Sequence, residues 1–334
     1  MSFLRRPRTL ASLAILAGLL ALCAYMTTLS TPRTTATSTP LPRRTRAPST
    51  PQPTSTPRAT PTPRPTPEGL PLQASLGDTW IRPADGMVMV FVPGGRFDMG
   101  SDKTQPDAED DEIPRHSVAL SSFWLDQTEV TNAQFARCVA AEACTPPYPP
   151  VLAIHEGYYE GPEYASYPAI NVDWQHGQNY CNWAGGQLPT EAQWEYAARG
   201  PNGRLYPWGD RPPDETLLNY AEIVNNTTPV GSYTDGASWV GAFDMAGNVW
   251  EWTADWYRFY PSTPQINPTG PDRGPGHVLR GGSWYDGASF VRSANRYVVR
   301  EAYAEYGRPR SYGFGVGFRC VVQTGELPPY PEAR

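Results

Sequence analysis

Cysteine and histidine are both scarce in this chain of 334 residues. Five cysteines are present, and none lies between Cys181 and Cys320. The four histidines, His116, His155, His176 and His277, are scattered without the spacing of metal ligands. A mononuclear iron centre, which needs two histidines and a carboxylate, is therefore not expected. No Gly-x-Ser-x-Gly segment is present either, so a serine hydrolase would lack its usual nucleophile motif.

Acidic residues are missing from the first 64 positions, which hold nine of the 27 Lys and Arg residues. Arg5, Arg6 and Arg8 precede an uncharged apolar run over residues 10–26, the order found in an export signal. The run has roughly 17 residues, the lower limit for a membrane-spanning helix. Because no small-x-small cleavage site follows, we predict that residues 1–26 form an uncleaved signal anchor. The bulky Leu22 directly before Cys23, where a lipid-attachment site needs a small residue, disfavours lipidation there.

Residues 27–72 are rich in Thr, Pro, Ser and Arg and have too little apolar surface to offset the entropy of ordering. We predict a disordered, extended spacer that holds a folded head, residues 73–325, outside the cell membrane, followed by a tail at 326–334. All 33 acidic residues but only 18 basic ones follow position 64, so nucleic acid is not an expected partner. An even count of four cysteines in an exported head indicates two disulfides.

Short strands, short helices and long irregular segments are expected in the head. The apolar run 87–92 ends at Pro93-Gly94-Gly95 and predicts a buried strand, followed by a second one at 96–99. The acidic stretch 102–112 reads as a solvated surface loop. Capping boxes starting at Thr131 and Thr190, and a cap at Asp173, predict three helices. Beyond residue 201 we expect loops with short strands at 277–279 and 318–322.

A set of markers occurs in one order along the head. They are Met87-Val88-Met89-Val90-Phe91-Val92-Pro93-Gly94-Gly95, Phe97-Asp98-Met99-Gly100, Glu129-Val130-Thr131-Asn132, Cys181-Asn182-Trp183-Ala184-Gly185, Leu188-Pro189-Thr190-Glu191-Ala192-Gln193-Trp194-Glu195, Tyr206-Pro207-Trp208-Gly209, Gly247-Asn248-Val249-Trp250-Glu251-Trp252, Arg280-Gly281-Gly282-Ser283-Trp284 and Gly317-Phe318-Arg319-Cys320. Together they resemble the formylglycine-generating enzyme (sulfatase-modifying factor) family over about residues 87–322. The resemblance implies an α+β, loop-rich variant of the C-type-lectin fold. It also implies a disulfide between Cys181 and Cys320. Cys138 and Cys144 would then close a small loop or remain as two buried thiols.

The family's chemistry, as the resemblance implies it, is oxidation of a sulfatase cysteine to formylglycine by oxygen at two cysteines that hold copper(I), a metal that selects thiolates. Asp286 and Val291 stand at those two positions. We therefore expect neither copper nor oxidase activity. The resemblance also implies a structural calcium site formed by Asp244, Gly247, Val249 and Glu251. Alternatively, Trp250 and Trp252 only pack there and Glu251 caps a turn. A second calcium site of the family would use Asn219, but the loop that would supply its other ligands is shortened here, so we do not expect that site.

Aromatic and polar residues after the Gly-Gly-Ser-Trp marker form the expected ligand-binding surface, because Tyr, Trp and Arg often anchor interfaces. The candidates are Trp284, Tyr285, Asp286, Ser289, Phe290, Asn295, Tyr297, Tyr303, Tyr306 and Arg308. Arg292 and Arg296 are expected to be structural ion-pair partners. The segment also resembles retroelement-diversified variable proteins, which use this fold for binding. We interpret the chain as a membrane-anchored, noncatalytic module that binds a protein, peptide or glycan. The alternative is a formylglycine-generating oxidoreductase with an unusual active centre.

Overall fold

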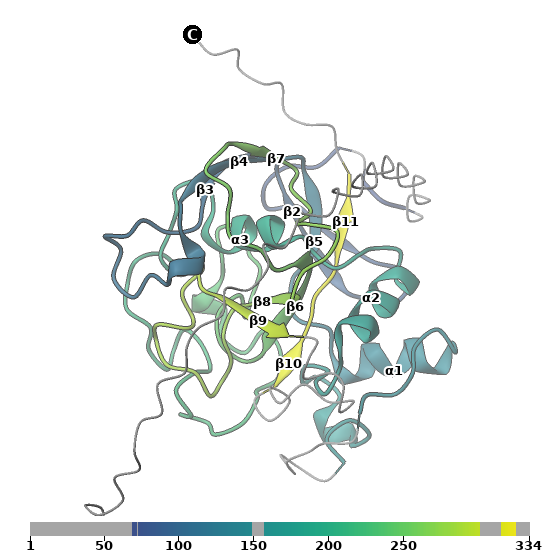
Figure 1. Ribbon diagram of the computed structural model, residues 1–334. Helices are drawn as coiled ribbons and strands as arrows, with labels where there is room; N and C mark the ends of the chain where they lie inside the picture. The colour runs from purple at the N-terminus through teal and green to yellow at the C-terminus, as the bar shows by residue number, and fades with distance from the viewer. Residues whose placement is uncertain (1–68, 72, 149–156, 301–314, 325–334) are drawn as a thin grey trace, which may run out of the picture. The chain divides into compact units, whose positions relative to one another are not determined.

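A computed structural model describes residues 69–71, 73–148, 157–300 and 315–324 (Figure 1). The predicted signal anchor, most of the spacer and the tail lie outside these residues. No helix in the described ranges is long and apolar enough to span a membrane. Leu70, which we assigned to the spacer, is buried in the core of the head. Packing of the head therefore begins before residue 73, because this leucine has apolar neighbours to cover it.

The first sheet has four antiparallel strands in the order β1-β2-β5-β11. They are β1 (Thr79–Ile81), β2 (Val88–Val92), β5 (Phe123–Asp126) and β11 (Val321–Gln323). Successive side chains of a strand point to opposite faces. Met89 and Phe91 of β2 pack in one core cluster, whereas Val90 and Val92 pack in another. The continuous apolar run therefore reflects a strand that is covered on both faces, which confirms the predicted buried strand.

The other two sheets frame the C-terminal half of the head. The second has the order β10-β6-β8-β9, with β10 (Val316–Gly317), β6 (Trp250–Trp256), β8 (Gly276–Arg280) and β9 (Arg296–Arg300). The third has the order β3-β4-β7, with β3 (Gly95–Met99), β4 (His116–Leu120) and β7 (Gln265–Ile266). The predicted strands at 96–99 and 277–279 are confirmed. Of the segment predicted as a strand at 318–322, only the last two residues belong to β11.

Three α-helices occur in the described ranges, and each begins directly after its predicted cap. They are α1 (Asn132–Ala140), α2 (Trp174–Trp183) and α3 (Glu191–Arg199), with short 3-10 turns at Asp110–Glu112, Pro162–Tyr164 and Thr234–Gly236. Both expected capping boxes form, and His176 completes a third one with Asp173. Every residue of α3 is buried, because this helix contacts β3 of one sheet and β8 of another (Figure 1).

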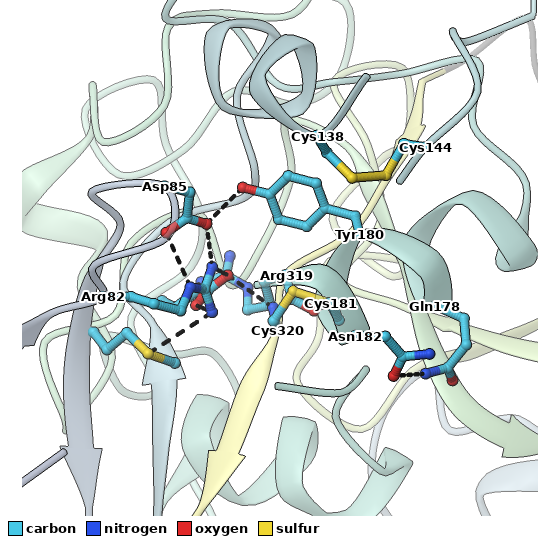
Figure 2. The surroundings of a disulfide bond; sticks show 12 residues. Arg82, Asp85, Cys138, Cys144, Gln178, Tyr180, Cys181, Asn182, Arg319 and Cys320 are labelled. Carbon is cyan, nitrogen blue, oxygen red and sulfur yellow. Dashed lines mark hydrogen bonds and ion pairs between the residues drawn. A yellow bond between two sulfur atoms is a disulfide. The ribbon is translucent and has the colours of Figure 1, made fainter. Parts of the chain in front are cut away.

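Two disulfides fix the loop-rich head, as expected. Cys181 of α2 is bonded to Cys320 just before β11, and Cys138 of α1 is bonded to Cys144 (Figure 2). A buried polar group lies beside them: the Tyr180 hydroxyl donates to Asp85 at 2.6 Å. The guanidinium of Arg82 binds the same carboxylate. The buried hydroxyl of Tyr180 and the buried carboxylate of Asp85 are thus both hydrogen-bonded, as polar groups inside a core must be.

Candidate functional site

The segment that follows β8 carries the positions where the family's copper-binding cysteines are expected. It starts at Gly281 and Gly282, both with positive φ. A Cβ atom on Gly282 would lie 2.8 Å from Cγ1 of Val291, so only glycine allows this close approach. The segment between β8 and β9 lies beside the start of β6, because the Trp284 amide donates to the carbonyl of Asn248 and the Trp250 indole donates to Asp286.

Asp286 is held rigidly at the first of these positions. Its Oδ2 atom accepts hydrogen bonds from the Trp250 indole at 2.9 Å, from the Ser283 amide at 3.0 Å and from the Ser283 hydroxyl at 2.6 Å. Its backbone carbonyl accepts from the amide of Ala221. The carboxylate is half-buried. Asp286 is thus a fixed anionic group built into the segment.

Val291, at the second position, is fully buried. It packs in a small apolar cluster with Tyr206, Leu217, Leu218 and Ala246. Four of the five cysteines are consumed by the two disulfides, and the fifth is Cys23 in the N-terminal segment. The head therefore has no thiol at either position, and all four of its cysteines are in disulfides.

The other expected ligand-binding residues divide between surface and core. Tyr285, Phe290 and Tyr297 are 42%, 38% and 47% exposed. Ser289 is half-buried, whereas Trp284 and Asn295 are buried. Tyr303, Tyr306 and Arg308 lie outside the described residues. The described part of the expected surface therefore keeps three exposed aromatic residues, Tyr285, Phe290 and Tyr297, whereas Trp284 and Asn295 are buried.

Arg292 and Arg296 form the ion pairs expected of them. Arg292 binds both oxygens of Glu112, at 2.9 and 2.6 Å, and Arg296 binds Glu191 at 2.6 and 2.9 Å. Burial alone would raise the pKa of Glu112, yet the hydrogen bonds from Arg292 and Ser101 bring it below its usual value. Glu112 is fully buried, which corrects our view of 102–112 as wholly solvated. One end of this acidic loop is pinned under the ligand-binding segment.

The residues expected to bind calcium lie in a buried region that is rich in carboxylates. Glu251 is fully buried, and Arg319 donates to both of its oxygens at 2.7 Å. Asp244 accepts the Gly231 amide at 2.5 Å. Gly247 and Val249 lie between them in the sequence, and Gly247 has a positive φ. A cluster of three or more side chains arranged as metal ligands is not found among the described residues.

Glu129 was missed by the sequence analysis as part of this region. It is fully buried, its Oε1 accepts from Asn248 at 2.9 Å, and its Oε2 has no hydrogen-bond partner among the described residues. Burial, reinforced by the nearby carboxylate of Asp244, raises the pKa of Glu129 well above its usual value. Burial also raises the pKa of Asp244. In the sequence, the one signal that Glu129 is more than a surface residue was its place in the Glu-Val-Thr-Asn marker.

Asn219, the residue of the doubtful second calcium site, lies close to this region. Its side-chain amide donates to the carbonyl of Asn226 at 2.7 Å and lies 3.4 Å from Oδ1 of Asn248. Its own Oδ1 atom has no hydrogen-bond partner among the described residues. Two buried oxygen atoms, on Glu129 and Asn219, thus lack a donor near the expected calcium ligands.

Comparison with known proteins gives consistent matches over the head. A family model described as a sulfatase-modifying factor enzyme 1-like domain matches residues 81–324. The formylglycine-generating enzyme of Streptomyces coelicolor is 35% identical over 291 residues, covering 72% of this chain and 90% of that one. A mouse relative, the inactive C-alpha-formylglycine-generating enzyme 2, is 33% identical, covering 72% and 88%.

Solved structures show the same fold. PvdO from Pseudomonas aeruginosa superposes with a TM-score of 0.61 at 26% identity, covering 75% of this chain and 100% of that one. Treponema denticola variable protein 1 superposes with a TM-score of 0.56 at 21% identity, covering 74% and 98%, and shows the fold alone. The sequence markers, the α+β architecture and these matches agree over the same residues. The chain belongs to the sulfatase-modifying factor family, whose members include the formylglycine-generating enzymes.

Proposed function

We propose that this chain is a noncatalytic, ligand-binding member of its family. The observation that carries the proposal is the replacement of both copper-binding cysteine positions by Asp286 and Val291. Copper(I) is held by soft thiolate ligands. A hard carboxylate fixed by Trp250 and Ser283, and an isopropyl group packed in an apolar cluster, supply none. One relative in the family is itself named inactive, so a member without the activity has a precedent.

The proposed binding surface is the aromatic face formed by Tyr285, Phe290 and Tyr297 around Asp286. Large exposed aromatic side chains supply contact area at a low cost in conformational entropy. Trp250 supports this face from below, because its ring lies 5.5 Å from that of Tyr297 and its indole donates to Asp286. A protein, peptide or glycan ligand is consistent with such a surface.

Calcium is part of the proposal as a structural ion. Glu129, Asp244 and Glu251 are buried together, and Arg319 bonds only to Glu251 among them. In the described structure, Glu129 and Asp244 therefore form no ion pair, and Oε2 of Glu129 has no donor there. Asp244, Glu251 and the carbonyls of Gly247 and Val249 would hold the ion, because calcium prefers oxygen ligands. Its double charge would compensate the buried carboxylates.

An extracytoplasmic, membrane-anchored location completes the proposal. Its support is the basic-then-apolar order of residues 1–26 and the oxidised state of both disulfides, which persist in oxidising compartments. The Pro-rich segment 27–68 would act as the spacer between anchor and head.

Copper(I) affinity tests the noncatalytic assignment. We expect a colorimetric copper(I) chelator to keep all of its metal when the full chain is added at equal concentration. The Streptomyces coelicolor relative serves as the positive control under the same conditions. If this chain removes one equivalent of copper(I) from the chelator, a thiolate-like centre exists and the proposal is wrong.

A further inference from the structure

We propose that Asp286 is the anchor for a cationic side chain, arginine or lysine, of a polypeptide partner. This inference rests on the proposed binding function, and it adds the chemistry of the ligand. Asp286 stands where relatives need a cysteine, so its role belongs to this chain rather than to the oxidase reaction.

The hydrogen bonds of Asp286 leave one side of its carboxylate unused. Three donors, all neutral, converge on Oδ2, and no donor among the described residues reaches Oδ1. The group is thus preorganised without being paired with a cation. A fixed carboxylate of this kind loses little entropy when a guanidinium or ammonium group binds to it.

The nearest arginines in the sequence are already committed elsewhere. Arg292 is engaged by Glu112 and also donates to the carbonyls of Asp107 and Ser289. Arg296 is engaged by Glu191 and is buried. Neither forms an ion pair with Asp286 in the described structure. No ion pair with Asp286 is found among the described residues, so its carboxylate is available to a cation supplied by a partner.

The aromatic groups around Asp286 fit a cation with a long apolar stem. Cations bind over aromatic faces, and arginine or lysine stems cover apolar surface while the charged end reaches a polar group. Tyr285 precedes Asp286 in the chain, and the ring of Tyr297 lies 5.5 Å from that of Trp250, whose indole donates to Asp286. Both tyrosines are exposed. The loop with the exposed side chains of Ile223 and Val224 is bonded to this face, because its amides at Ala221 and Glu222 donate to the carbonyls of Asp286 and Trp284.

The charge of the whole head favours the same class of partner. Acidic residues exceed basic ones, 33 to 18, beyond position 64. Several arginines are buried in ion pairs, and their carboxylate partners are buried with them, so these pairs leave the acidic excess unchanged. An acidic surface raises the local concentration of cationic partners and speeds their association.

The test uses the full chain and two blocked pentapeptides that differ in one residue. One has the sequence glycine-tyrosine-arginine-tyrosine-glycine, and the other has citrulline, the neutral isostere, in place of arginine. We expect the arginine peptide to bind about tenfold more tightly, the scale of a charge-assisted pair, with an advantage that shrinks as salt is added. Calorimetry or fluorescence titration measures both affinities.

Two variants separate the possible outcomes. Asp286→Asn keeps an oxygen for Trp250 and Ser283, and we expect it to abolish the advantage of the arginine peptide. The control Asp98→Asn, at an exposed position of β3, should leave that advantage intact. Circular dichroism establishes whether Asp286→Asn is folded, and Asp286→Ser takes its place in the comparison if it is not.

Equal affinities for the two peptides, no binding of either, or an arginine advantage that survives Asp286→Asn would overturn this inference. The proposed function is tested separately by replacing Tyr285 and Tyr297 with alanine. Loss of binding of both peptides in that variant supports the aromatic face as a binding surface, whether or not Asp286 selects the charge.

Discussion

Buried arginines connect distant parts of the head at the scale of single residues. Arg292 joins the ligand-binding segment to the acidic loop, and Arg319 joins the strand end before β11 to β6. Arg280 contacts Glu195 of α3 and lies over the Trp194 ring. A buried charge is tolerated only with a partner of opposite charge. Each of these arginines therefore fixes a loop that has little regular structure of its own.

Replacing Arg292 by alanine should destabilise the head severely. The change leaves Glu112 buried without its cation, which costs about 3–5 kcal/mol in comparable cases. As a matched control, Arg115→Ala removes an exposed ion pair with Asp102 and should cost no more than about 1 kcal/mol. Urea denaturation measures both values. Equal and small losses would show that the Arg292–Glu112 pair does not hold the acidic loop.

Residue roles could be predicted only in part from the sequence. Arg292 and Arg296 were expected to form ion pairs, but their partners Glu112 and Glu191 lie 180 and 105 positions away. Such pairs depend on which loops the fold brings together, and no local pattern encodes that. The same reason explains why Glu129 was not connected with Asp244. Asn295, a candidate ligand-binding residue, is buried with its side-chain amide 3.5 Å from Glu112 of the acidic loop, a contact that its neighbours in the chain do not reveal.

At the scale of secondary-structure elements, the helices were predicted correctly because residues at their ends mark where each one begins. All three helices begin after a residue whose side chain caps the first turn, as Thr190 does for α3. Strand β5 was missed because a short, mostly apolar strand that is covered on both faces shows no alternation of polar and apolar residues. β6 does alternate apolar and polar residues over Trp250–Trp256, so its signal was present in the sequence and was overlooked. Its pairing with β8 has a register shift between Trp252 and Trp256, which no sequence pattern indicates.

The capping box of α3 gives a prediction at the scale of this element. The backbone amide of Gln193 donates to the Thr190 hydroxyl at 3.2 Å, and the backbone amide of Thr190 donates to Oε1 of the Gln193 side chain at 2.9 Å. Thr190→Ala should lower the free energy of unfolding by about 1 kcal/mol, whereas Thr190→Ser should restore most of the loss. Chemical denaturation measures both. If alanine and serine behave alike, the hydroxyl is not the stabilising group.

At the scale of the whole molecule, the family resemblance predicted what composition could not: the loop-rich α+β fold, the Cys181–Cys320 pair and the positions that lack cysteine. The disulfides and the buried ion pairs support a head with long irregular segments. The proposed calcium ion would add to this support, because a ligand that binds only the folded state stabilises it.

Calcium chelation should lower the melting temperature of the full chain. With free calcium at 100 times the dissociation constant, the expected loss is roughly 5–10 °C for a domain of this size. Asp244→Asn should weaken this response, and Asp98→Asn should preserve it. Calorimetry with and without chelator, together with metal analysis, measures the effect. An unchanged melt and no bound calcium in the untreated protein would rule out the proposed ion.

The most direct test of the central claim is turnover of a peptide with a sulfatase cysteine motif. The full chain is incubated with copper(I), oxygen, a reductant and the peptide, and mass spectrometry follows the conversion of cysteine to formylglycine. The Streptomyces coelicolor enzyme provides the positive control. We predict that the peptide keeps its cysteine, because Asp286 and Val291 provide no thiolate for the metal. Formation of formylglycine above the enzyme-free background would contradict this account.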